Sequence, residues 1–195
     1  MKTQSNKVVM IGPSGVGKTS LLDRINRNEF NDYAFSTVGV SYETHDIIVD
    51  NRRLRLHIWD TTGQDKFKFL LPSFIKGARV VLLCFDEPNV SEIQNRIVDI
   101  ESLEPNIKII IVLTKIDINC NKLDIYQPVL EYAEYKNLEL FFTSSLTGKG
   151  VKELFEDIGR YFLTFRDSKI DEKIIDIGKS ADNIINNEKS CCTIF

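Results

Sequence analysis

The sequence predicts a single α/β domain: a six-stranded, mostly parallel sheet with one antiparallel strand and about five helices on both faces. Two observations favour this fold class. Short continuous apolar runs alternate with longer segments whose apolar residues recur at helical spacing, a pattern typical of buried parallel strands joined by crossover helices. In addition, 195 residues with 43% hydrophobic content suffice for one sizeable core, so one domain is favoured over two.

The individual elements follow from turns and periodicity. Buried strands are predicted where apolar runs are bounded by turns, at Val8–Ile11, Val80–Phe85, Ile107–Leu113 and Leu138–Phe142. Two further segments flank the turn residues Asp50 and Asn51 and predict an antiparallel hairpin, Ser41–Val49 and Leu54–Trp59. Amphipathic spacing predicts helices at Lys18–Arg27, Ser91–Leu103, Ile125–Lys136 and Val151–Phe165.

Composition restricts the class of protein. The folded domain is expected to span residues 1–166, and the charged segment 167–195 is expected to be a mobile tail. A net charge of −3 gives no indication of a nucleic-acid partner. No apolar stretch approaches the ~20 residues of a membrane span, and the polar start has no signal-peptide pattern. We therefore expect a cytoplasmic protein, with Cys84 as a buried thiol.

A phosphate-binding loop is the strongest motif. Residues 12–19 read GPSGVGKT, directly after a predicted strand and before a predicted helix. The glycines let successive backbone N–H groups curl around phosphate oxygens at the positive end of the helix. Lys18 then reaches the β- and γ-phosphates, and the Thr19 hydroxyl is a Mg²⁺ ligand. The nucleotide-binding residues expected here are Ser14, Gly15, Val16, Gly17, Lys18, Thr19 and Ser20.

Two further motifs indicate which class of nucleotide is bound. Residues 60–64, DTTGQ, follow a strand, so that Asp60 can hold Mg²⁺, the Gly63 N–H can reach the γ-phosphate and Gln64 can orient a water. Asp117, in the segment 114–117 (TKID), can accept two hydrogen bonds from guanine that adenine cannot supply. A loop after the last strand can offer a backbone N–H to guanine O6. Its residues are Ser144, Ser145 and Leu146.

In this order and spacing, residues 7–166 resemble the Ras superfamily of small GTPases, and the Rab branch in particular. The Rab-like segments are 37–42 (TVGVSY), 55–59 (RLHIW), 74–78 (FIKGA) and 82–86 (LLCFD). The resemblance implies that Thr37 binds Mg²⁺, that Phe30 stacks on the base, that Thr114 and Lys115 contact the nucleotide, and that Gln64, Lys18 and Gly63 serve hydrolysis. It implies an effector surface of Val38, Gly39, Val40, Tyr42, Trp59 and Phe74.

Several positions depart from the family pattern. Thr62 replaces the usual alanine, which leaves open a GTP-binding scaffold with impaired hydrolysis. A Ras- or Rho-like signalling GTPase is a separate alternative. Thr114 replaces the usual asparagine, and Leu146 the usual lysine. Tyr42, Trp59 and Phe74 could instead be core residues, since aromatic residues on strands are commonly packed. A nucleotide kinase is disfavoured because no second cluster of substrate-binding arginines is present.

The last four residues, CTIF, fit a C-a-a-X prenylation motif with Cys192 as the acceptor, and Cys191 beside it can take a second lipid. This motif predicts peripheral attachment to the cytosolic face of an intracellular membrane. The resemblance implies a GTP/GDP switch in vesicle trafficking, with Mg²⁺ as cofactor. It also implies four kinds of protein partner: an exchange factor, a GTPase-activating protein, a GDP-dissociation inhibitor and effectors.

Overall fold

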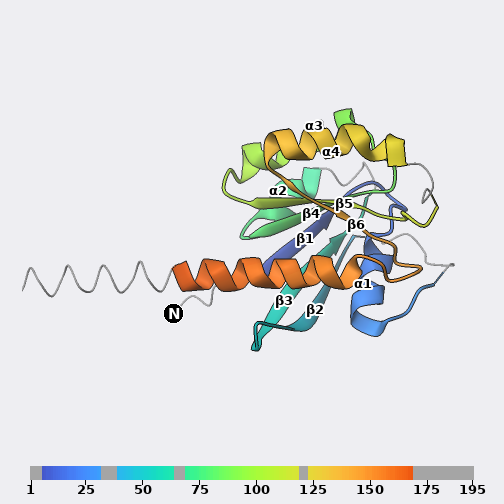
Figure 1. The fold of residues 1–195 in the computed structure, drawn as a ribbon. Helices are drawn as coiled ribbons and strands as arrows, with labels where there is room; N and C mark the ends of the chain where they lie inside the picture. The colour runs from blue at the N-terminus through green and yellow to red at the C-terminus, as the bar shows by residue number, and fades with distance from the viewer. Residues whose placement is uncertain (1–5, 32–38, 64–68, 119–122, 169–195) are drawn as a thin grey trace, which may run out of the picture.

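The computed structural model describes residues 6–31, 39–63, 69–118 and 123–168. Within these residues six strands form one sheet in the order β2-β3-β1-β4-β5-β6, and every pairing is parallel except β2 with β3 (Figure 1). The predicted mostly parallel sheet with one antiparallel strand is confirmed. The strands are β1 (Lys7–Ile11), β2 (Val40–Val49), β3 (Arg52–Thr61), β4 (Val80–Phe85), β5 (Lys108–Leu113) and β6 (Glu139–Phe142).

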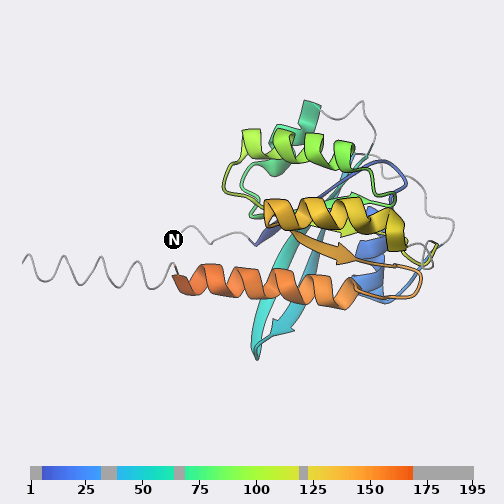
Figure 2. The same cartoon turned by 45° about the horizontal axis from the view of Figure 1, so that its top comes forward.

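Helices cover both faces of the sheet, as predicted. Figures 1 and 2 show α1 and a C-terminal helix on one face and α2, α3 and α4 on the other. Among the described residues, none of these helices is long and apolar enough to cross a membrane. The helices are α1 (Lys18–Arg27), α2 (Leu71–Ile75), α3 (Val90–Leu103), α4 (Gln127–Lys136), which follows the 3-10 turn η2 (Leu123–Tyr126), and the C-terminal helix, described over residues 151–168.

Each face of the sheet has its own hydrophobic core, because strands buried on both sides send alternate side chains to opposite faces. On one face, Leu21 of α1 and Phe155 of the C-terminal helix pack against Val8 and Leu82. On the other face, Ile93 of α3 and Val129 of α4 pack against the strand side chains that point to that side of the sheet and form the second core with them. Cys84 is a fully buried free thiol in β4, as predicted, and burial raises its pKa to about 12.

The hairpin turn has the residues that its geometry requires. Asp50 and Asn51 both have positive φ, at 49° and 59°, and the register pairs Val49 with Arg52 across them. Asparagine and aspartate tolerate this left-handed conformation better than most residues, and a two-residue turn of this kind matches the twist of the strands. The hairpin predicted from these two residues is confirmed.

Candidate nucleotide site

The phosphate loop lies between β1 and α1, at the carboxyl end of the central strand. Gly17 occupies the N-cap of α1 with φ 98°, a left-handed conformation that a side chain would strain. The N-terminal N–H groups of α1 therefore open toward the loop, where an anion is stabilised by the helix dipole. The geometry of residues 12–19 is therefore compatible with their predicted phosphate-binding role.

Lys18 places its ammonium within this loop. Its Nζ donates to the carbonyl oxygens of Gly12 at 2.9 Å and Pro13 at 2.8 Å, and the residue is only 6% exposed. Burial lowers the pKa of Lys18, while the nearby Cys84, Asp60 and Asp86 act in the opposite direction. The two carbonyl contacts hold the charged group in one position, where it can meet a phosphate.

Two oxygen donors from different elements meet beside the loop. The Thr19 hydroxyl of α1 donates to Asp60 Oδ2 at 2.5 Å, and Asp60 is fully buried near the end of β3. The neighbouring Thr61 hydroxyl donates to the Met10 carbonyl at 2.7 Å and so fixes this end of β3 against β1. An alcohol and a carboxylate are hard oxygen ligands of the kind that Mg²⁺ prefers, so this donor pair fits that ion.

Gly63 lies against the backbone of the phosphate loop. A Cβ at Gly63 would be 2.2 Å from the Pro13 carbonyl carbon and 2.3 Å from the Ser14 nitrogen, so only glycine fits this approach. The Thr62 N–H donates to the Gly39 carbonyl at 2.8 Å, and Thr62 is 8% exposed. The segment after β3 thus lies against the phosphate loop and is hydrogen-bonded to the residue before β2.

A pocket of about 450 Å³ continues from this loop. It receives residues from the phosphate loop, from α1 and the segment after it, and from the loops that follow β5 and β6, because the carboxyl ends of parallel strands share one edge of the sheet. Most of the predicted base-binding residues lie together here. The lining is Gly15, Gly17, Ser20, Phe30, Asn31, Thr114, Lys115, Asp117, Ile118, Ser145 and Leu146.

Thr114 connects the base side of the pocket to the phosphate side. Its hydroxyl lies 2.6 Å from the Val16 carbonyl of the phosphate loop and 3.1 Å from the Phe85 carbonyl at the end of β4. The residue is 2% exposed. Beside it, Lys115 Nζ forms an ion pair with Asp86 Oδ2 at 2.7 Å. These contacts hold the segment that presents Asp117 to the pocket.

Arg24 is a site residue that the sequence analysis missed. Its guanidinium donates to the backbone carbonyls of Ser145 at 2.6 Å and Leu146 at 2.8 Å, and also to Asn28. In the same loop Ser144 is fully buried, and its hydroxyl accepts from the Thr147 N–H. The last turn of α1 therefore holds the loop predicted to contact guanine. A basic residue near a helix C-terminus gives no indication of a partner more than a hundred positions away.

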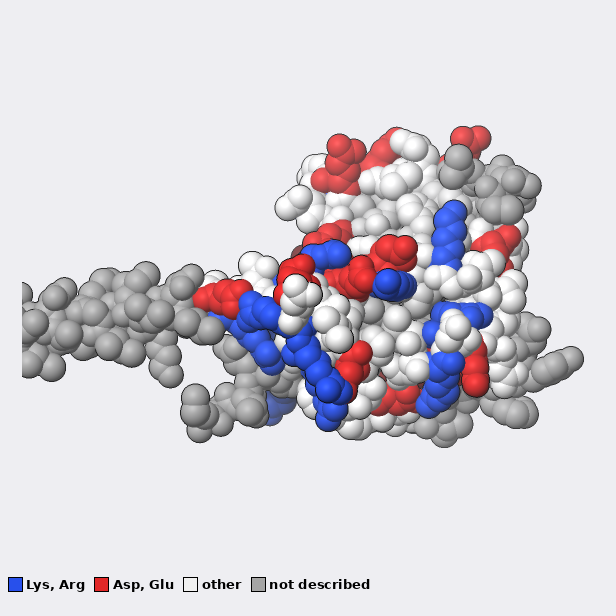
Figure 3. All heavy atoms as spheres, turned by 60° about the horizontal axis from the view of Figure 1, so that its bottom comes forward, with Lys and Arg blue, Asp and Glu red and all other residues white. Residues whose placement is uncertain are grey.

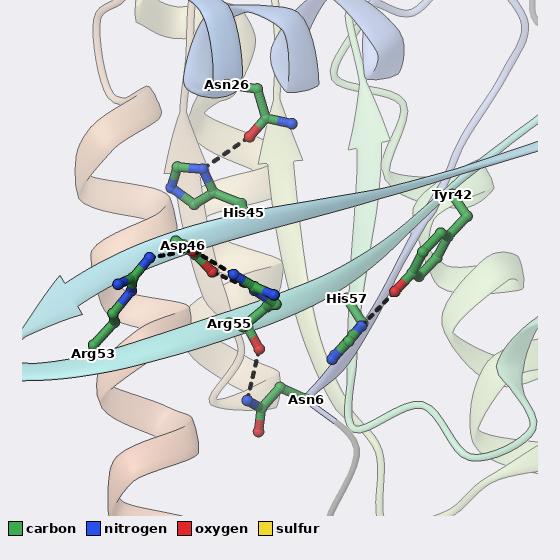
Figure 4. Close-up of polar contacts among 8 residues, drawn as sticks. All are labelled: Asn6, Asn26, Tyr42, His45, Asp46, Arg53, Arg55 and His57. Carbon is green, nitrogen blue, oxygen red and sulfur yellow. Dashed lines mark hydrogen bonds and ion pairs between the residues drawn. The ribbon is translucent and has the colours of Figure 1, made fainter.

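The aromatic residues predicted as an effector surface lie on adjacent elements. Tyr42 of β2 and Trp59 of β3 are directly opposite in the register, with ring centroids 4.8 Å apart. Tyr42 is 52% exposed, so it is not a core residue, whereas Trp59 and Phe74 are half-buried against the second core. The Tyr42 hydroxyl also hydrogen-bonds His57 Nδ1 at 2.6 Å, as Figure 4 shows. His57 is thus part of this surface.

Five predicted site residues lie outside the described residues: Thr37, Val38, Gln64, Cys191 and Cys192. Of the other effector positions, Gly39 precedes β2, and Val40 at its start is 37% exposed. The described residues that are predicted to bind phosphate, Mg²⁺ and the base therefore lie at one edge of the sheet.

The comparisons with known proteins agree with this arrangement. The family model described as "Ras family" matches residues 7–164. The chain is 33% identical to GTP-binding protein ypt3 of Schizosaccharomyces pombe over 78% of this chain and 73% of that protein. It is 32% identical to Ras-related protein Rab-4 of Dictyostelium discoideum over 83% of this chain and 81% of that protein.

Ras-related protein RABA1c of Arabidopsis thaliana is 33% identical over 78% of this chain and 72% of its own length. The family-model match, residues 7–164, covers all six strands of the sheet. The chain belongs to the Ras family and is a Rab-like small GTPase.

Proposed function

We propose that this protein is a Mg²⁺-dependent GTP switch that hydrolyses GTP slowly by itself and recruits trafficking effectors to a membrane while GTP is bound. The observation that carries the proposal is the hydrogen bond between the Thr19 hydroxyl and the buried Asp60 carboxylate. This contact joins the start of the phosphate-loop helix to the end of β3. When bound, Mg²⁺ would be held by Thr19, Asp60 and Thr37, and would neutralise charge on the β- and γ-phosphate oxygens.

In the proposed reaction, water attacks the γ-phosphorus of GTP in line with the bond to the leaving GDP oxygen, and GDP and phosphate are released. Lys18 and the N–H groups of the phosphate loop stabilise the charge on the phosphate oxygens, and Gln64 orients the water. The Gly63 N–H binds the γ-phosphate. A partner protein is proposed to supply an arginine that stabilises the charge developing on the γ-phosphate.

Guanine selectivity is proposed to come from Asp117, whose carboxylate accepts from N1–H and the exocyclic amine of the base. Adenine has no donors in that arrangement, so it would leave the carboxylate unsatisfied. Phe30 stacks on the base, and the backbone of Ser145 and Leu146 forms another wall of the base pocket. These assignments rest on the position of the named residues around the 450 Å³ pocket.

Hydrolysis is proposed to act as the off-signal. Loss of the γ-phosphate removes the group that Thr37 and Gly63 would contact, so the segments that contain these two residues relax. The surface around Tyr42, Trp59 and Phe74 then changes. Exchange factors, activating proteins and a GDP-dissociation inhibitor are the regulators that such a cycle requires. Prenyl groups on Cys191 and Cys192 would hold the protein on the cytosolic face of an intracellular membrane.

Single-turnover hydrolysis of GTP by the purified full chain tests the proposal. Wild type with Mg²⁺ should hydrolyse GTP slowly, and removal of Mg²⁺ by a chelator should lower both nucleotide affinity and rate. Gln64→Leu should lower the rate on the order of tenfold or more without weakening nucleotide binding, whereas Lys18→Ala should weaken GTP binding.

Lys152→Ala is the matched control for Lys18→Ala, because Lys152 is 78% exposed on the C-terminal helix. It should leave GTP binding and turnover unchanged. Unchanged GTP affinity in Lys18→Ala would contradict the phosphate-loop assignment, and retained turnover in Gln64→Leu would give the orientation of the water to another residue.

A further inference from the structure

A basic surface lies at the amino end of β1, at the opposite end of the strands from the nucleotide pocket. Figure 3 shows lysine and arginine side chains gathered beside the point where the C-terminal helix leaves the domain. We call this surface the basic face and define it by six residues. They lie in four parts of the chain rather than one continuous segment: Lys7 in β1, Arg52, Arg53 and Arg55 in β3, Arg79 just before β4, and Arg166 in the C-terminal helix.

Contacts between the sheet and the C-terminal helix make the basic face one continuous surface. Asn6 donates through Nδ2 to the Arg55 carbonyl at 2.8 Å and accepts from Arg166 at 3.2 Å, so it joins the two elements. Arg52 forms a two-pronged ion pair with Asp167 of the helix, at 2.8 and 3.0 Å. The described end of the helix is thus fixed to the hairpin and to β1.

Two cation–π contacts hold further residues of the basic face in place. The Arg79 guanidinium lies over the Phe165 ring at 4.3 Å, and Lys7 Nζ lies 4.7 Å from the Trp59 ring. Cations held over aromatic rings keep their charge while their side chains become ordered. The positive charges therefore have defined positions on this end of the domain.

The basic face keeps a net positive charge although it includes acidic residues. Arg53 and Arg55 both bind the Asp46 carboxylate, at distances of 2.6 to 2.8 Å (Figure 4). They hold the pKa of Asp46 far below its usual range, so this carboxylate remains ionised. Asp46, Asp50 and Asp167 give the basic face three negative charges, against six positive charges from its lysine and arginines. Arg53 and Arg55 are 72% and 58% exposed, so their remaining donors face solvent.

The segment that follows the described domain has no net positive charge. Residues 169–195 contain five acidic residues and four lysines, and the whole chain has a net charge of −3. The chain leaves the described domain at residue 168, beside the basic face, on its way to the predicted lipid acceptors. A single lipid chain gives only marginal membrane binding, and basic residues near an anionic surface strengthen it.

We propose that the basic face binds the anionic headgroups of a phospholipid bilayer and orients the domain on the membrane with its nucleotide pocket directed away from the lipid. The inference rests on the proposed lipid anchoring of this GTPase. A bilayer is favoured over an acidic protein because the chain continues from this same end toward Cys191 and Cys192.

Vesicle co-sedimentation with the full chain lacking lipid modification tests the basic face separately from the anchor. The vesicles are phosphatidylcholine alone or phosphatidylcholine mixed with phosphatidylserine, at low and at raised salt. Wild type should bind the vesicles that contain phosphatidylserine at low salt concentration and should lose this binding as the salt concentration increases. It should not bind vesicles of phosphatidylcholine alone. Arg53→Gln/Arg55→Gln should weaken binding roughly tenfold or more.

Two further variants make the result specific. Asp46→Asn removes a negative charge from the basic face and should strengthen binding severalfold, a gain that misfolding cannot produce. Lys149→Gln/Lys152→Gln removes two exposed charges at the carboxyl end of β6, at the opposite end of the strands from the basic face, and should bind like wild type. Nucleotide binding, measured in the same samples, should be equal in all variants.

Equal binding by the two double variants, or capture of soluble polyglutamate without vesicle binding, would overturn the membrane assignment. The proposed function fails in a different way. Loss of nucleotide-dependent hydrolysis, or failure of Cys191 and Cys192 to accept prenyl groups, would contradict the switch or the anchor while leaving the vesicle result as it stands.

Discussion

The Thr114 hydroxyl lies 2.6 Å from the Val16 carbonyl and donates a hydrogen bond to it, although the two residues are 98 positions apart in the chain. Thr114 stands where the resemblance leads one to expect asparagine. The shorter side chain still reaches the phosphate loop, because the end of β5 and the loop lie at the same edge of the sheet. The base and phosphate sides of the pocket are therefore joined by a buried hydroxyl.

We expect Thr114→Val to increase the rate of nucleotide dissociation. The substitution keeps the shape of the side chain but removes the donor, and loss of one partner of a buried hydrogen bond costs about 1–3 kcal/mol, or roughly tenfold in affinity. The measurement is the release of a fluorescent GDP analogue. Thr114→Ser retains the hydroxyl and should remain close to wild type, and equal release rates for Thr114→Val and wild type would refute the joining role.

Arg24 should control how long the nucleotide stays bound. Arg24→Gln would lose the charge-assisted hydrogen bonds to the Ser145 and Leu146 carbonyls, which are each worth about 1.5–3 kcal/mol. The loop that faces the base would then be less ordered, and GDP release should accelerate at least tenfold. The same fluorescence assay measures it.

Arg27→Gln is the control for Arg24→Gln. Arg27 lies in the same last turn of α1 but pairs with Asp23 and Glu43, away from the loop after β6. GDP release from this variant should match wild type. If both variants accelerate release equally, the effect is one of general helix stability and the specific role of Arg24 is lost.

Gly63→Ala should slow hydrolysis. The added methyl group would meet the Pro13 carbonyl carbon at 2.2 Å, so the backbone must shift at a cost of about 1–3 kcal/mol, which corresponds to roughly tenfold in rate or more. Single-turnover kinetics measures the effect. Thr62→Ala, which removes atoms at the neighbouring position, should hydrolyse GTP at least as fast as wild type; a slower rate there would assign the effect to the segment as a whole.

Stability should depend on the protonation of His45. This histidine lies between α1 and the C-terminal helix, where its Nδ1 is 2.8 Å from Asn26 Oδ1 and its ring meets Phe155 edge-on. Asn26 donates through its amide nitrogen to Glu43, so Oδ1 is the acceptor and His45 Nδ1 carries the proton. Burial lowers the pKa of His45 below its ordinary value of 6.5, against a smaller opposite effect of Asp46.

Because the folded state binds this proton less readily than the unfolded state, the free energy of unfolding should fall as the pH drops below about 6.5. Urea unfolding across about pH 5–8 measures this slope. His45→Gln should reduce the slope, whereas His57→Gln should retain it because His45 is still present. Identical slopes in wild type and His45→Gln would exclude His45 as the source.

Much of the fold was predictable because its information is local. The helix Lys18–Arg27 and the strand Val80–Phe85 have the predicted bounds, since side-chain periodicity within one element decides which of its faces is buried. The turn at Asp50 and Asn51 was predictable for the same reason. Small differences occur at the ends, as at β6, which begins at Glu139 rather than Leu138.

The sequence by itself determined the fold class, the phosphate loop and the Ras-family order of the motifs, because each is a pattern of neighbouring residues. Only the tertiary structure decided that Arg24 holds the loop after β6 and that Asn6 joins Arg55 to Arg166. These contacts bring together side chains far apart in the chain. Their geometry depends on how the helices pack on the sheet, which no local pattern encodes.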